Sequence, residues 1–132
     1  MIVTNHLNPS ERDALEQALR ELSTNYCDQV RFVALFGSKA RGDFGLESDI
    51  DLLIICEQDD WQTRDQIRAP VFDANIDHTV MMSPWVIPSA RFKTLPLRRP
   101  GLFADLCRDA IALWRRPGTE YPLKTPVLAL AA

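Results

Sequence analysis

At 132 residues the chain has the length of one domain, long enough to bury a core and too short for two domains of ordinary size. Apolar residues make up 46% of it and charged residues 25%, the balance of a globular protein in water, and the net charge of -3 argues against a protein whose whole surface binds nucleic acid. The segment 91–116 differs from the rest, because its lysines and arginines far outnumber its two aspartates.

The sequence also bears on the compartment of the protein. Its three cysteines are scattered and lack the spacing of a zinc site, which predicts a reduced, cytoplasmic protein. The first residues, MIVTNHLNPSERD, contain no basic segment followed by an apolar one, so we expect no signal peptide. No apolar run approaches the roughly 20 residues that a membrane-spanning helix needs, and we expect no membrane association.

The first predicted element is a helix that begins after Asn8. Asn8 can cap it, Pro9 suits its first position, and Glu11 stands where a capping box requires an acidic side chain. Apolar residues then recur at helical spacing as far as Leu22, which predicts that the helix runs to about residues 23–25 and buries one face.

Two strands are predicted next, at 30–36 and 49–56. The first is rich in β-branched and aromatic residues and ends at a glycine, and the second is apolar enough for both of its faces to be covered. Between them, residues 38–42 predict a turn that runs into one or two helical turns, and residues 43–48 predict a loop.

The predicted order beyond the second strand is a helix, a strand and a proline-rich loop. Residues 61–69 have weak helical character that we expect Pro70 to stop, and residues 76–82 predict a third strand. Trp85 follows, between two prolines, where it would contact a partner or cover the edge of the sheet.

A closing helix is predicted from Leu102 to Trp114, because apolar residues recur at helical spacing along that stretch. Residues 1–118 are therefore predicted to form a single domain, followed by a proline-spaced tail at 119–132. Helices that alternate with strands predict an α/β fold.

Two acidic residues interrupt the second apolar strand. Asp49 and Asp51 are two residues apart, so in a strand they project to the same side, with side chains that start about 7 Å apart. At an effective dielectric of about 20, two full charges at that distance repel by about 2 kcal/mol. A divalent cation would reverse the sign of this interaction, and Mg²⁺ prefers oxygen ligands. The alternative is a solvated acidic start of a strand.

A second feature precedes the carboxylates. Gly37 and Ser38 follow a strand and open a turn, where glycine permits a close backbone approach and free amides attract phosphate. Lys39 and Arg41 add positive charge, although Arg41 could instead pair with an acidic residue within 43–47. The pattern is not a P-loop. Together, a phosphate cradle and a carboxylate pair predict a nucleoside triphosphate held with Mg²⁺.

These residues carry a resemblance to a known family. GSKARG at 37–42, followed by SDIDLL at 48–53, resembles the signature of the DNA polymerase β-type nucleotidyltransferases, and more narrowly that of the small stand-alone minimal nucleotidyltransferases of prokaryotes. The resemblance implies a mixed sheet with helices packed on one side, two Mg²⁺ ions, and transfer of a nucleoside monophosphate from ATP or another NTP with loss of pyrophosphate. Lys39 departs from the small or uncharged residue often found at its position.

Residue roles follow from the resemblance as expectations. Asp49 and Asp51 would bind metal, and a third carboxylate would lie on a neighbouring strand. Asp77 is the first candidate, because a strand-like run follows it, and Asp73 is the second. Asp77 would complete the metal site beside the acceptor hydroxyl and help to remove its proton; the alternative is an exposed residue at a strand start. His78, which would point to the opposite face of that strand, is expected to be a packing or surface residue.

The resemblance also bears on partners. Larger relatives carry a helical domain that holds the acceptor, and about 132 residues leave no room for one beside the catalytic fold. The acceptor would then come from another protein or from self-association. The resemblance implies a separately encoded helical partner of the HEPN type, to which the chain, as an antitoxin, would attach AMP. One alternative is a non-catalytic neutralising or scaffolding subunit, and another is transfer to a small molecule such as an aminoglycoside.

Overall fold

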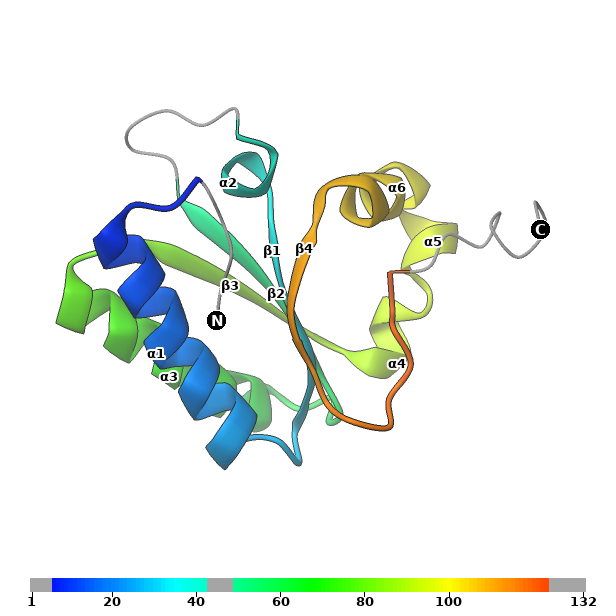
Figure 1. The fold of residues 1–132 in the computed structure, drawn as a ribbon. Coiled ribbons are helices and arrows are strands. Elements are labelled where there is room, and N and C mark those ends of the chain that lie inside the picture. Colours follow the sequence, from blue (N-terminus) through cyan, green and yellow to red (C-terminus); the bar gives the residue numbers. More distant parts are fainter. Residues whose placement is uncertain (1–5, 43–48, 124–132) are drawn as a thin grey trace.

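The computed structural model describes residues 6–42 and 49–123 (Figure 1). These residues form a sheet of four strands with helices on both of its faces. In chain order the elements are α1 (Pro9–Asn25), β1 (Val30–Phe36), α2 (Ser38–Arg41), β2 (Ile50–Cys56), α3 (Trp61–His78), β3 (Met82–Pro88), α4 (Ser89–Phe92), α5 (Leu95–Arg98), α6 (Pro100–Asp109) and β4 (Ile111–Arg115). The predicted α/β fold is confirmed.

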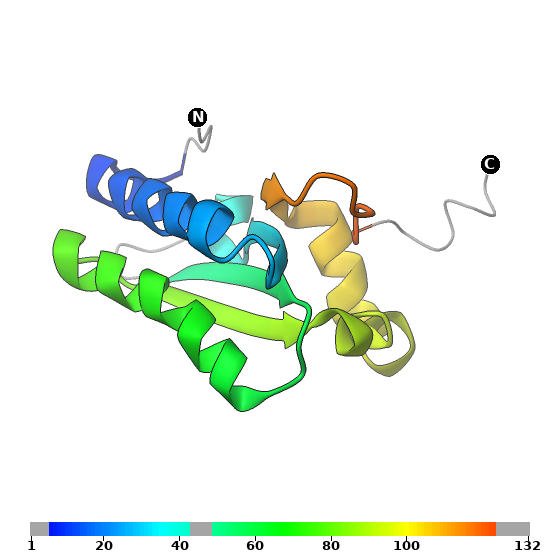
Figure 2. The same ribbon diagram turned by 90° about the horizontal axis from the view of Figure 1, so that it is seen from below.

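The strand order of the sheet is β3-β2-β1-β4. β1 pairs antiparallel with both β2 and β4, and β2 pairs parallel with β3, so the sheet is mixed, as the resemblance implied. The resemblance implied helices packed on one side, whereas α4, α5 and α6 pack on the second face. Parallel neighbours need a crossover connection, and α3 supplies it by returning the chain from the end of β2 to the start of β3. Figure 2 shows α1 and α3 side by side along one face of the sheet.

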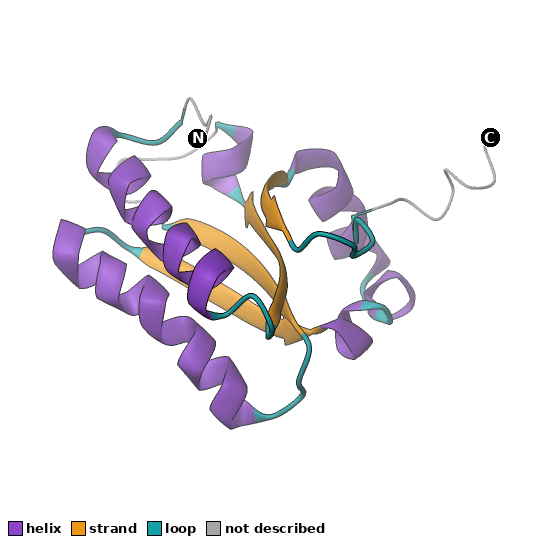
Figure 3. Cartoon of the chain, turned by 60° about the horizontal axis from the view of Figure 1, so that its bottom comes forward, coloured by secondary structure: helices purple, strands orange, loops and turns teal. Residues whose placement is uncertain are grey.

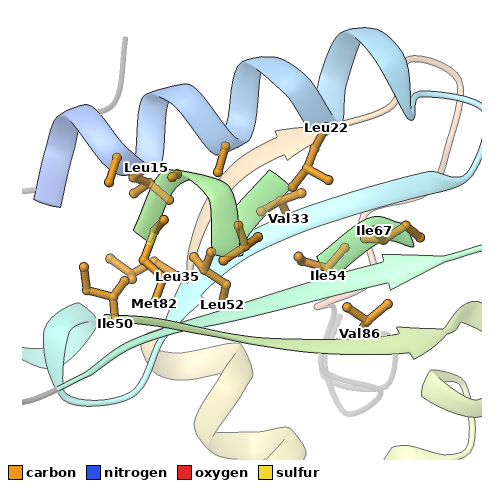
Figure 4. Packing of buried hydrophobic residues seen from close by; sticks show 14 of the residues in the cluster. Leu15, Leu22, Val33, Leu35, Ile50, Leu52, Ile54, Ile67, Met82 and Val86 are labelled. Atoms are coloured by element: carbon orange, nitrogen blue, oxygen red, sulfur yellow. The ribbon is translucent and has the colours of Figure 1, made fainter. Parts of the chain in front are cut away.

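Figure 3 shows these two long helices lying along the sheet, and the larger apolar cluster joins their residues to those of the strands. Leu15 and Leu22 of α1 point toward the strands, where they meet side chains such as Val33 and Ile54 (Figure 4). The alternate strand residues, among them Phe32 and Leu53, face the other side and form a second cluster with α4, α5 and α6. β1 and β2 are therefore covered on both faces, as the continuous apolar character of β2 predicts.

The start of α1 confirms the predicted capping box. The Glu11 backbone N–H donates to Asn8 Oδ1 at 2.8 Å, and the Asn8 backbone N–H donates to Glu11 Oε1 at 3.0 Å. These bonds satisfy two amides that a helix start would otherwise leave unpaired. β1 and α2 also lie at the predicted residues, whereas the predicted loop at 43–48 lies outside the described residues.

The prediction that Pro70 ends the third helix is wrong. α3 begins at an Asp60 cap, which accepts from the Thr63 backbone N–H at 2.7 Å, and continues through Pro70 to His78. Pro70 is buried, so packing of its ring in the interior offsets the lost backbone hydrogen bond. The helix ends at Thr79, whose φ of 54° is the left-handed conformation that commonly ends helices.

The third strand begins later than predicted, because α3 occupies the first residues of the predicted strand. Residues 76–78 belong to α3, and the strand is β3, Met82–Pro88. Asn75 fixes the turn between them, because its side chain donates to the Met82 carbonyl at 3.0 Å and accepts from the Met82 backbone N–H at 2.9 Å. Pro84 lies within β3, which the sheet tolerates because β3 is an edge strand and Pro84 needs no partner on the outer side.

The predicted closing helix is also too long. α6 ends at Asp109, and Ala110 is already extended, with φ −68° and ψ 142°. Leu113 and Trp114 belong to β4, where Trp114 pairs with Val33 of β1. The apolar residues of 111–115 fit a strand as well as a helix, and pairing gives the outer edge of β1 its hydrogen-bond partners.

The residues after β4 pack back onto the domain. The ring of Tyr121 meets the edge of Phe32, with centroids 5.6 Å apart, and Leu123 is buried in the second cluster. The predicted boundary at residue 118 stays a prediction. Among the residues that the structure describes, none of the helices has the length and apolar character needed to cross a bilayer.

Candidate active site

Two carboxylates and a hydroxyl meet at one end of β2. Asp51, the second residue of β2, pairs with Phe36 on β1 and with Ser83 on β3. Asp49 directly precedes β2, and its Oδ2 lies 3.3 Å from Ser83 Oγ, which donates to it. The prediction that Asp49 and Asp51 come together is thus met by the structure, on the sheet face that also holds the second cluster.

The electrostatics of this pair agree with the repulsion expected from the sequence. Burial is the main cause of a raised pKa for Asp51, the negative charge of Asp49 raises it further, and the charge of Arg41 partly opposes both. An uncompensated anion at this position therefore costs free energy. Two carboxylates and a hydroxyl are hard oxygen donors, so the residues present fit a divalent cation such as Mg²⁺.

Gly37 makes room for one of these carboxylates. Its φ is 78°, a conformation that glycine adopts readily, and a Cβ built there would lie 2.3 Å from Asp51 Oδ2. Its carbonyl accepts from the backbone N–H groups of Ala40 and Arg41, both at 3.1 Å, as α2 begins. The glycine that the sequence assigned to phosphate binding is therefore also required by the close approach of β1 to Asp51. Ser38 is the first residue of α2.

Lys39 and Arg41 differ in their surroundings. Lys39 is only 4% exposed, and its Nζ lies 3.1 Å from Glu11 Oε2 at the start of α1. The buried amine thus links α2 to α1, a contact that the sequence did not indicate. Arg41 is exposed, and it acts on Asp109 as well as on Asp51: Arg108 is the main cause of the lowered pKa of Asp109, and the charge of Arg41 lowers it further.

The prediction that Asp77 lies on a neighbouring strand is wrong. Asp77 and Asp73 are both on α3, which packs on the opposite face of the sheet from Asp51. Asp77 Oδ2 accepts from Gln17 Nε2 at 2.8 Å, and both aspartates line a groove of about 440 Å³ between α1 and α3. His78 Nε2 lies 2.7 Å from Gln17 Oε1, so it joins the same contact between the helices.

The neighbouring strand carries no acid at all. β3 has the sequence MSPWVIP, and its residue opposite Asp51 is Ser83. Across residues 6–42 and 49–123, no three side chains of His, Cys, Asp or Glu gather to hold a metal ion. Sequence reasoning missed Ser83, because only the correct position of β3 would have identified it.

Two aromatic rings lie beside the carboxylates on the same face. Phe36 is the last residue of β1, and Trp85 is two residues beyond Ser83 on β3. Their ring centroids are 6.0 Å apart across β2, with the planes inclined by 62°. Both are half-buried and border the second cluster. The sequence singled out Trp85 but did not relate it to the carboxylates.

The sequence of the chain matches the sequence model of one protein family. It is described as "Polymerase beta, Nucleotidyltransferase", and it covers residues 17–83. The match includes Gly37, Asp49 and Asp51, and it ends at Ser83. The residues that gather at the end of β2 therefore lie within the part of the chain that the family model matches.

Two curated relatives match a shorter segment. Both are proteins of Methanocaldococcus jannaschii named "Putative protein adenylyltransferase". One is 40% identical over 50 residues, which cover 38% of this chain and 50% of the relative. The other is 39% identical over 46 residues, which cover 35% of this chain and 46% of the relative. The chain thus spans about half the length of the curated relatives it matches.

Two solved structures are similar in fold. A toxin-antitoxin crystal structure with AMP-PNP has 18% identity and a TM-score of 0.47, and the match covers 80% of this chain and 73% of that one. A structure titled as a "putative nucleotidyltransferase" from Sulfolobus solfataricus has 19% identity and a TM-score of 0.45, with 87% and 96% covered. These likenesses concern the fold alone.

Proposed function

Because the chain belongs to the polymerase beta nucleotidyltransferase family, we propose that it transfers a nucleoside monophosphate, AMP from ATP, to an acceptor hydroxyl. In this reaction the acceptor oxygen forms a bond to the α-phosphorus, the bond from that phosphorus to the bridging oxygen breaks, and pyrophosphate leaves. The acceptor hydroxyl loses its proton to water. The observation that carries the proposal is the convergence of Asp49 and Asp51 at the end of β2, where the Asp51 carboxylate faces Gly37.

Asp49 and Asp51 would hold Mg²⁺, which when bound offsets the negative charge of the triphosphate and of the two carboxylates. The described donors form one cluster of two acids and a hydroxyl, which supports one ion, and the second ion that the resemblance implies stays a prediction. Ser83, which donates to Asp49, keeps that carboxylate turned toward β3. The acceptor hydroxyl would approach beside the Asp49 carboxylate.

Gly37, Ser38 and Arg41 would hold the triphosphate. Gly37 brings the start of α2 against the Asp51 carboxylate, so phosphates placed at α2 would also lie beside the metal ligands. Arg41 would place its charge near both. Lys39, whose buried amine is bound to Glu11, would act indirectly by holding α2 in place. We assign Asp77 no part in this site, because its helix lies on the other face of the sheet.

We also propose a protein as the acceptor. The relatives whose names specify an activity are protein adenylyltransferases, which supports a protein rather than a small molecule. The resemblance in the sequence further favours a helical partner of the HEPN type, encoded separately, with the chain acting in the cytoplasm as its antitoxin. Self-association is the alternative source of the acceptor hydroxyl.

One observation favours a second candidate function. β3 carries Ser83 where the resemblance implies a third carboxylate, and a non-catalytic subunit would not need that acid. Such a subunit would bind the same partner without modifying it. The two retained carboxylates weigh against this alternative, since their repulsion has no purpose in a scaffold.

A labelling experiment separates the two functions. The chain is incubated with Mg²⁺, ATP labelled at the α-phosphate, and the product of the neighbouring gene as the candidate partner. We expect label on protein, and its loss in a variant that combines Asp49→Asn and Asp51→Asn. Asp77→Asn is the matched control, because it removes a carboxylate from the other face and should keep the label. Partner binding without any label would support the non-catalytic subunit instead.

A further inference from the structure

The aromatic pair beside the carboxylates has no part in the reaction described so far. We propose that Trp85, supported by Phe36, is the platform on which the nucleotide's base stacks. This inference rests on the proposed function, because it takes the α-phosphate to lie at Asp49 and Asp51. It adds a residue that binds the ring of the nucleotide and the selectivity that this residue would give, for purine over pyrimidine triphosphates.

Strand register places the ring platform on the correct face. Ser83 lies opposite Asp51 and Trp85 lies opposite Leu53, so both β3 side chains project to the same side as the Asp51 carboxylate. Two residues along a strand advance about 6.6 Å. Trp85 thus lies about 6.6 Å along β3 from Ser83, which is beside the carboxylates. The base of a nucleotide is separated from its α-phosphate by the ribose, so a nucleotide held by its phosphates would place its base near Trp85.

Contacts across β2 bring the indole closer still. Phe36 pairs with Asp51, and the rings of Phe36 and Trp85 are 6.0 Å apart, so the indole lies against a residue that is the direct neighbour of the Asp51 position. Beneath it Leu53 is fully buried, which gives the ring a rigid apolar support. Trp85 itself stays half-buried on an edge strand, so part of it faces solvent.

The chemistry of the platform sets what it would select. Every base has a π-face that can stack, so the platform would accept any base, and it would favour the larger rings of the purines. The indole offers one donor and no acceptor, and it would discriminate poorly between adenine and guanine. We therefore expect purine triphosphates to bind more tightly than pyrimidine triphosphates, with adenine and guanine close together.

A purely structural role makes a different prediction. If Trp85 only covered the rim of the second cluster, its replacement would disturb the whole site, and every ligand would lose affinity alike. Inorganic tripolyphosphate separates these cases, because it carries the phosphates of ATP without a ring. If Trp85 is a platform for the base, its replacement lowers the affinity for ATP and leaves the affinity for tripolyphosphate unchanged.

The experiment uses the full chain with magnesium and two ligands, ATP and tripolyphosphate. Calorimetry of Trp85→Ala should show about a tenfold or larger loss of ATP affinity and an unchanged tripolyphosphate affinity. Trp85→Phe, which keeps a ring, should bind ATP within about threefold of the original. Circular dichroism checks that each variant is folded.

Tryptophan fluorescence gives a second readout. The chain has three tryptophans, and Trp61 is 68% exposed on α3, on the other face of the sheet. ATP should quench the fluorescence of the original chain and of Trp61→Phe, but not that of Trp85→Phe. Tripolyphosphate should quench none of them.

Equal losses for both ligands in Trp85→Ala, or quenching that persists in Trp85→Phe, would overturn the platform while leaving the nucleotide site intact. If neither ligand binds the original chain, the proposed function fails and the platform fails with it.

Discussion

Replacement of Lys39 by methionine tests the link between α2 and the start of α1. The Lys39 side chain is 4% exposed and that of Glu11 is 13% exposed, with their charged atoms 3.1 Å apart. Methionine keeps most of the length and apolar stem of lysine, so the change removes a charge with little loss of packing. Glu11 would keep the hydrogen bond that it accepts from the Asn8 backbone.

The expected magnitude lies between two limits. Removal of one partner from a fully buried ion pair costs about 3–5 kcal/mol, and an exposed pair contributes about 0–1 kcal/mol. Because Glu11 keeps its capping bond and some contact with water, Lys39→Met should lower the free energy of unfolding by about 2 kcal/mol. Glu11→Gln should also destabilise, since it removes the negative charge that lies 3.1 Å from the buried ammonium of Lys39, and the double variant should lose less than the sum.

Urea unfolding of the four proteins measures this coupling. Arg108→Met is the control, because the side chain of Arg108 is 65% exposed, so loss of its solvent-screened ion pairs with Asp105 and Asp109 should leave the urea midpoint nearly unchanged. A Lys39→Met protein as stable as the original would refute the buried contact. Strict additivity of the two single changes would refute it equally.

Three further predictions concern Gly37, Asp51 and Glu57. Gly37→Ala should destabilise by roughly 1–3 kcal/mol, because it adds a Cβ 2.3 Å from Asp51 Oδ2 at a φ of 78°; an unchanged thermal midpoint would contradict this. Asp51→Asn should raise the urea midpoint of the metal-free protein at neutral pH, because burial and then the neighbouring aspartate raise the pKa of Asp51. A carboxyl group whose pKa is raised by folding stabilises the protein while it is protonated: this contribution is complete below the pKa of the unfolded state and is lost as pH rises through the pKa of the folded state. The stability gained by Asp51→Asn should therefore vanish in acid. A gain independent of pH would count against the reasoning. Glu57→Gln should destabilise at neutral pH and not in acid: burial alone would raise the pKa of Glu57, but hydrogen bonds from Arg116 and Arg31 lower it, and the stabilisation of such a group is lost as pH falls through the lowered pKa. Urea midpoints across this pH range check the Glu57 prediction, and an effect that persists in acid would disprove it.

The first half of the fold follows from local signals. The capping box of Asn8 and Glu11 predicts where α1 begins, and two runs rich in β-branched and other apolar residues predict β1 and β2 within a residue. These signals involve neighbours in the chain, so the sequence shows them directly. The convergence of Asp49 and Asp51 was predictable for the same reason, because it depends only on the alternation of side chains in one strand.

The second half depends on distant contacts that the sequence does not display. Pro70 is a helix breaker by propensity, yet burial of its ring within α3 outweighs that cost. With the helix extended to His78, Asp77 moves from a predicted strand to the groove between α1 and α3. Trp114 moves the other way, from a predicted helix to β4, because β1 needs a partner at its outer edge.

The same limit applies to the site. Ser83 and Trp85 join the carboxylates only through the register of β3 on β2, which local patterns do not determine. The burial of Lys39 depends on a contact 28 residues away, at Glu11. Sequence reasoning therefore brought together Asp49 and Asp51, which are neighbours along one strand. It did not place Ser83 and Trp85 beside them, because these two residues reach the site only through the pairing of β3 with β2.

Binding of a divalent cation tests the central claim most directly. Mn²⁺ can stand in for Mg²⁺, and its paramagnetic resonance distinguishes free from bound ion in the presence of a non-hydrolysable ATP analogue. We predict one bound Mn²⁺ that Mg²⁺ displaces, a loss of affinity of at least about tenfold in both Asp49→Asn and Asp51→Asn, and no change in Asp77→Asn. Mn²⁺ that binds the two site variants as tightly as the original chain would contradict the account.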